Sequence, residues 1–136
     1  MEELYHISKM ILGDCIKFLL FIIASILKWA LQPVLFTYGV FRSLSKGLLA
    51  NYVRDLAIAK DCYGNVLGQH LFNDVLISKK SKHLFGSIRQ TISAIIGYNY
   101  MDRTSLFLGK VIYKTLDTIE EAHCEKAVLS DKVNVN

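Results

Sequence analysis

The sequence predicts an all-α protein in which an apolar N-terminal membrane helix precedes a small bundle of three to four short helices. Residues 18–41 form a run of 24 residues with a single charge, Lys28. The rest of the chain spaces its apolar residues at helical intervals. The 136 residues suit one ordinary domain beside the apolar run. We therefore expect a membrane-associated segment at 1–42, a helical domain at 43–128 and a flexible tail at 129–136.

The apolar run is long enough to cross a bilayer. A helix of this length measures about 36 Å, and the hydrocarbon core is about 30 Å thick. Lys28 costs roughly 2.5–3.5 kcal/mol on insertion, but about a dozen Leu, Ile and Phe side chains each return a few tenths. We expect a spanning helix; the alternatives are an in-plane helix and a buried core helix. Pro33 lacks an amide donor and predicts a kink or break near residues 31–33.

The polar side chains of this segment fall on one line. At about 100° per residue, an arc of about 80° holds Glu3, Asp14, Lys17, Ser25, Lys28 and Gln32. This polar stripe favours contact with a partner or a watery lumen over a simple anchor. It predicts a homo-oligomer with inward-facing stripes, or packing on another membrane protein or on the chain's own C-terminal helices.

The charge distribution predicts an orientation. Residues 42–110 hold ten Lys or Arg against four Asp, a net +6, whereas residues 1–41 sum to zero. A positive flank directly after the apolar run faces the cytoplasm and its anionic lipid. If the helix spans, this rule places Arg42, Lys46 and Arg54 inside and the N-terminus outside.

Neither a nucleic acid partner nor a secreted location is expected. The only tight basic cluster is Lys79, Lys80 and Lys82, and no aromatic residues interleave with it. The three cysteines are an odd number and widely spaced, which fits a reducing compartment. The chain starts with Glu2 and Glu3, and no cleavage motif follows the apolar run, unlike a secretory signal.

Helices are expected over 43–60, 66–77, 87–96 and from about 102 to 124. The intervening DCYGN at 61–65 predicts a turn, because Gly64 and Asn65 supply the positive φ that a helix end needs. Ser87 is the expected N-cap of the third helix, and Gly97 its C-terminal stop. A basic loop covers residues 78–86.

His123 and Cys124 are the only candidates for catalysis. Neighbours on a helix point about 100° apart, so they cannot form a dyad with each other. A thiol hydrolase with Cys124 as nucleophile needs a partner such as His70, His83 or Asp74; the alternative is a capping His beside a packed Cys. No metal site is expected, because no Cys or His pair has zinc-site spacing. No cofactor motif is present.

Four segments resemble a family of small membrane proteins encoded by bacteriophages and prophages. They are DCYGNVLGQHLFNDVLI at 61–77, LFGSIRQTISAIIGYN at 84–99, LGK at 108–110 and EEAHCEKAV at 120–128. This chain departs from the pattern in its basic loop and its longer N-terminal segment. The resemblance implies a viral origin and a place in the host inner membrane or a virion membrane, and it implies no particular activity.

These observations favour a non-enzymatic membrane protein that acts by associating with lipid, with itself or with another protein. An oligomeric membrane-permeabilising protein of the lysis type is one alternative, and the thiol hydrolase is the other.

Overall fold

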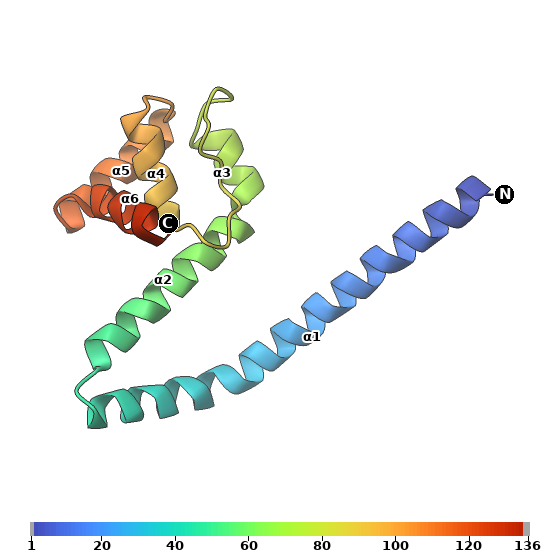
Figure 1. Cartoon of the computed structure of the whole chain (residues 1–136), viewed down its shortest axis with the longest axis horizontal. Coiled ribbons are helices and arrows are strands. Elements are labelled where there is room, and N and C mark those ends of the chain that lie inside the picture. Colours follow the sequence, from blue (N-terminus) through green and yellow to red (C-terminus); the bar gives the residue numbers. More distant parts are fainter. Residues whose placement is uncertain (1, 135–136) are drawn as a thin grey trace. The chain divides into compact units, whose positions relative to one another are not determined.

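A computed structural model describes residues 2–134 and divides the chain into two compact units, Met1–Tyr52 and Val53–Asn136. The described residues form helices and no strand (Figure 1). The helices are α1 (Glu2–Ser45), α2 (Leu49–Leu67), α3 (Gln69–Val75), α4 (Ile92–Met101), α5 (Phe107–Ile119) and α6 (His123–Asn134). The predicted all-α class is confirmed, with five helices after α1 in this part of the chain. The boundary between the units lies within α2, ten residues beyond the predicted end of the first segment at residue 42.

Unit 1 consists of α1 and the first turn of α2. α1 has 44 residues and is therefore about 66 Å long. A kink or a break was predicted near Pro33; the helix continues through this residue without a break, and its ribbon bends in its second half (Figure 1). The Thr37 hydroxyl donates to the carbonyl of Pro33 at 2.7 Å. After Ser45, Gly47 adopts φ +68°, a conformation that glycine tolerates and that ends the helix.

Most of the large apolar side chains of α1 are exposed. From Tyr5 to Ser45, this helix is long and apolar enough to cross a membrane. No residue in its most apolar stretch of 18 residues is buried. Trp29, for example, is 77% exposed. Within unit 1, the apolar side chains of this part of α1 are therefore not covered by protein.

The core of unit 2 forms where α4 packs on α5 and α6 (Figure 1). Ile95 and Ile96 of α4 are fully buried, and Gly97 beside them is buried as well. A Cβ at Gly97 would lie 2.8 Å from the Cys124 carbonyl oxygen and 2.8 Å from Val128 Cγ2. Gly97 was predicted to end a helix, and that prediction is wrong: it lies inside α4, where it lets α6 approach closely.

The predicted turn at residues 61–65 is also wrong, because α2 continues to Leu67. Asn65 is fully buried in this helix and uses its side chain to hold a loop. Its amide nitrogen donates to the carbonyls of Ser87 at 3.0 Å and Gln90 at 2.8 Å, and its oxygen accepts from the Gly86 amide at 2.9 Å. Residues 86–90 are therefore fixed as a loop.

Two further asparagines hold the rest of the basic loop. Asn73 of α3 pairs with Phe85, accepting from its amide at 2.9 Å and donating to its carbonyl at 3.1 Å. Asn99 of α4 donates to the His83 carbonyl at 2.8 Å and accepts from the Ser81 hydroxyl. We call Asn65, Asn73 and Asn99 the asparagine clamp.

Because Asn65 holds residues 86–90 as a loop, α4 starts later than predicted. Its N-cap is Thr91, whose hydroxyl accepts from the Ala94 amide at 3.1 Å, and Ser87 lies in the loop.

The expected helix from 102 to 124 is two helices. α5 ends at Ile119, and Ala122 takes φ +57° before α6 begins at His123. α6 then runs to Asn134 and buries Val128 and Asp131, so most of the expected tail at 129–136 is helical. Residues 135–136 lie outside the described part of the chain.

Candidate functional site

The polar stripe of α1 keeps the arrangement that its spacing predicts. Because α1 is a continuous helix, Asp14, Lys17, Lys28 and Gln32 lie on one side of it. All four are exposed. Lys17 Nζ pairs with Asp14 Oδ1 at 2.9 Å, which partly neutralises the end of the stripe nearer the N-terminus.

The predicted basic flank is divided between the two units. Arg42 lies in the last turn of α1, and Lys46 follows that helix. Arg54 belongs to unit 2, where its Nε lies 3.6 Å from Asp55 Oδ1. Arg54 also lines a polar cleft of unit 2. Its surroundings therefore differ from those of Arg42 and Lys46.

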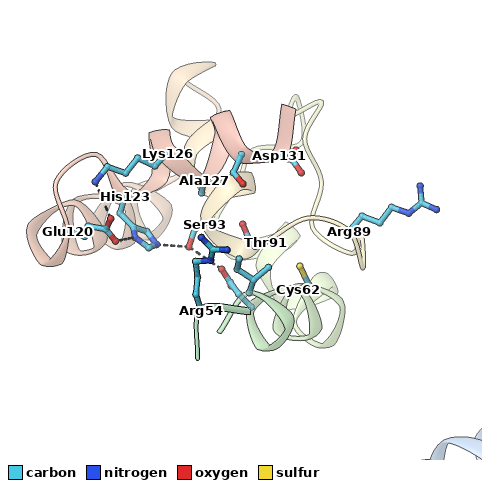
Figure 2. A pocket seen from close by; sticks show the side chains of 13 residues that line it. Arg54, Cys62, Arg89, Thr91, Ser93, Glu120, His123, Lys126, Ala127 and Asp131 are labelled. Carbon is cyan, nitrogen blue, oxygen red and sulfur yellow. Dashed lines mark hydrogen bonds and ion pairs between the residues drawn. The ribbon is translucent and has the colours of Figure 1, made fainter. Parts of the chain in front are cut away.

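The polar cleft of unit 2 has a volume of about 310 Å³ and lies among α2, α4 and α6. Figure 2 shows Glu120, His123 and Ser93 pointing toward one another, whereas Arg89 extends away from them. Lys126 and Asp61 also line the cleft. The cleft therefore gathers both signs of charge around one imidazole.

A chain of hydrogen bonds joins these side chains. Ser93 Oγ lies 3.2 Å from Asp61 Oδ2 and 3.2 Å from His123 Nε2. The other ring nitrogen, His123 Nδ1, lies 2.9 Å from Glu120 Oε2, and Lys126 Nζ donates to Glu120 Oε1 at 3.1 Å. The network connects three helices through residues that are far apart in sequence.

The charges of the cleft shift the pKa values of its members. Hydrogen bonds from His123 and Lys126 hold the pKa of Glu120 below its usual range. Burial, followed by the charges of Asp61 and Asp131, raises the pKa of the Cys62 thiol. Glu120 is therefore ionised, and Cys62 stays a thiol, at neutral pH.

Ser93, His123 and Glu120 have the same order as the triad of a serine hydrolase, with Nε2 toward the hydroxyl and Nδ1 toward the carboxylate. Two contacts oppose that chemistry. The Ser93 hydroxyl has one proton, and Asp61 competes with His123 as its acceptor. Asp61 Oδ1 also accepts from the Ile92 amide at 3.2 Å, which holds this competing carboxylate beside Ser93. The arrangement is better suited to joining α2, α4 and α6 than to nucleophilic attack.

The structure gives Cys124 no means of activation. Its side chain is fully buried, and burial, then the nearby carboxylates of Asp117 and Asp61, raise the pKa of its thiol to about 11. Within residues 2–134, no hydrogen bond joins its sulfur to an imidazole. A nucleophilic thiol requires a lowered pKa, so these observations do not support the thiol hydrolase.

Among the described residues, no hydrogen bond or ion pair joins His123 to His70, His83 or Asp74, the partners proposed from the sequence. His83 instead stacks on Tyr98 with ring centroids 4.4 Å apart, and its Nε2 lies 3.4 Å from Asp102 Oδ2. His70 is exposed on α3. Among the described residues, no group of three or more His, Cys, Asp or Glu side chains is placed to hold a metal ion.

Ser93, Asp61 and Glu120 were missed by the sequence analysis. Ser93 and Asp61 lie 30 and 62 residues before His123 along the chain. The only local signal was the i,i+3 spacing of Glu120 and His123. Comparison with known protein families, curated proteins and solved structures finds no match to this chain.

Proposed function

We propose that this is a non-enzymatic membrane protein whose α1 anchors a small helical domain to a bilayer, where it acts by associating with lipid, with itself or with another protein. One observation supports this most strongly: no residue is buried in the most apolar stretch of 18 residues of α1. So large an apolar surface is unfavourable in water. A bilayer removes it from water.

The length of α1 limits how it can enter the membrane. About 66 Å of helix is roughly twice the 30 Å hydrocarbon core, so a spanning α1 keeps about half of its length outside the core. We place residues 18–41 in the core, with the polar residues before Phe18 at one surface and Arg42 at the other. An in-plane helix is the alternative.

Carbonate extraction tests the anchor. The protein should stay in the membrane pellet, and Ile22→Arg with Ile26→Arg should release it, because each charge costs about 2.5–3.5 kcal/mol at the centre of a bilayer. Thr115→Arg with Thr118→Arg adds the same charge at exposed positions of α5 and should leave extraction unchanged. Release of the wild-type protein would contradict insertion.

Cysteine labelling tests the orientation, with Cys15 replaced by Ser. An impermeant maleimide applied to intact cells should label Glu2→Cys and should not label Ser130→Cys, because the positive-inside rule predicts that unit 2 faces the cytoplasm. Equal labelling of both positions would contradict a single span.

An oligomeric, membrane-permeabilising protein is the second candidate, supported by the polar stripe. Stripes packed face to face give Lys17 and Lys28 water or polar partners inside the bilayer. Lys17→Leu with Lys28→Leu should change the oligomer size in detergent, whereas Lys9→Leu with Lys46→Leu removes two charges away from the stripe and should not. A monomeric wild type across detergents would exclude the pore.

The resemblance to phage-encoded proteins adds a proposed location, the host inner membrane or a virion membrane. Immunodetection in fractionated infected cells and in purified virions tests it. Detection only in the soluble fraction of both would contradict it.

A further inference from the structure

Two cations on one side of α5 and a third in the loop that precedes α5 lie around exposed apolar side chains. Phe107, Lys110, Val111 and Lys114 lie on one side of α5 by their helical spacing. They line a hollow of about 570 Å³ together with Arg103 of the preceding loop and Tyr100 of α4. We call Arg103, Phe107, Lys110, Val111 and Lys114 the α5 face. They belong to unit 2 and are separate from the polar cleft.

The charge of the α5 face has one sign. No acidic residue lines the hollow, and in the described part of the chain Arg103, Lys110 and Lys114 form no ion pair. The polar cleft differs, since its cations lie among Asp61, Glu120 and Asp131. A hollow lined by three cations and by no acidic side chain attracts anions.

The apolar members of the α5 face are unusually exposed. Phe107 is 78% exposed, and Val111 is 45% exposed. Leu106 and Met101, which flank this face, are also exposed. Exposed aromatic and aliphatic side chains beside Lys and Arg form the composition of a helix that lies in a membrane interface, with its apolar groups among the headgroups and its cations on phosphate.

We propose that the α5 face binds an anionic lipid bilayer as a second membrane contact, in addition to α1. Phe107 and Val111 enter the headgroup region, and Arg103, Lys110 and Lys114 pair with lipid phosphates. This inference rests on the proposed function, because anchoring by α1 keeps unit 2 at a high effective concentration near the same surface. Each cation near an anionic surface strengthens association about fivefold, so the three together contribute about a hundredfold.

The full chain, with Cys15 replaced by Ser, is reconstituted in vesicles of phosphatidylcholine, with or without phosphatidylglycerol. An environment-sensitive fluorophore is attached at Thr118→Cys, one turn beyond Lys114 on the same side of α5, or at Ser130→Cys in the polar cleft. Brominated phospholipids should quench the label at position 118 in vesicles with phosphatidylglycerol, and should quench it weakly in phosphatidylcholine or at position 130.

Matched charge variants test the residues. Arg103→Gln, Lys110→Gln and Lys114→Gln together should reduce quenching at position 118 to the level of phosphatidylcholine alone. Lys79→Gln, Lys80→Gln and Lys82→Gln remove the same charge from the exposed loop and should leave quenching unchanged. Phe107→Ser changes a largely exposed side chain, so unit 2 should fold normally and quenching should fall.

Three results would overturn the inference: no effect of phosphatidylglycerol, equal loss in both triple variants, or RNA binding by the detergent-solubilised protein that only the α5 triple variant loses. Carbonate extraction of the same vesicles separates the two proposals. Release of the protein refutes the anchor, whereas retention without quenching at position 118 refutes the α5 contact alone.

Discussion

Asn65→Leu should strongly destabilise unit 2. Asn65 is fully buried and makes three hydrogen bonds to the backbone of residues 86–90. Each bond contributes about 1 kcal/mol net, and buried backbone groups left without partners cost about 1–3 kcal/mol each. Leucine has the same number of side-chain heavy atoms but no polar group, and it excludes water from the site, so we expect a loss of about 3–5 kcal/mol. This is a large part of the stability of an ordinary domain, about 5–15 kcal/mol.

The assay is urea unfolding in mild detergent, followed by near-ultraviolet circular dichroism of tyrosine. Tyr100 and Tyr113 stack with ring centroids 3.7 Å apart and report on the core of unit 2. Tryptophan fluorescence reports on α1, because Trp29 is the only tryptophan. Asn51→Leu, at an exposed position of α2, is the control and should change stability by less than about 0.5 kcal/mol. A loss below about 1 kcal/mol for Asn65→Leu would refute the reasoning.

Gly97→Ala should destabilise unit 2 by about 1–2 kcal/mol, because the overpacking penalty against Cys124 and Val128 exceeds the gain in helix propensity; an unchanged urea midpoint would contradict the close contact. A thiol reagent should modify exposed Cys15 in the folded protein and reach buried Cys62 and Cys124 only on unfolding, and rapid reaction of all three thiols would show that unit 2 opens. Since burial raises the folded pKa of Cys124 from 9.0 to about 11, the contribution of this thiol is complete below pH 9 and declines as the pH rises toward 11. Cys124→Ala should flatten the alkaline stability profile, and an unaltered profile would contradict this assignment.

Composition was enough to predict α1 because a long apolar helix depends on the sum of many similar residues. The class and the stripe both follow from hydropathy and from the 100° repeat of a helix. Pro33 alone could not decide between a kink and a break. It removes one hydrogen bond from a helix that has many, so the helix bends and continues.

The helix ends of unit 2 were mispredicted because glycine and asparagine serve two purposes. Gly97 and Asn65 have the residue types that end helices, but here one permits close packing of α6 and the other holds a loop. Those uses depend on residues far along the chain. The polar cleft could not be predicted from the sequence for the same reason. His123 was identified as a candidate, but Ser93 reaches it only after α4 and α6 pack together.

The asparagine clamp separates the shape of the basic loop from the sequence at its tip. Asn99, Asn73 and Asn65 hold Ser81, Phe85 and the residues after it mainly through backbone groups, while Lys79 and Lys80 project into solvent. The tip should accept insertions and foreign peptides without loss of the fold. An epitope placed between Lys79 and Lys80 would provide a marker on unit 2 for locating the protein in living cells.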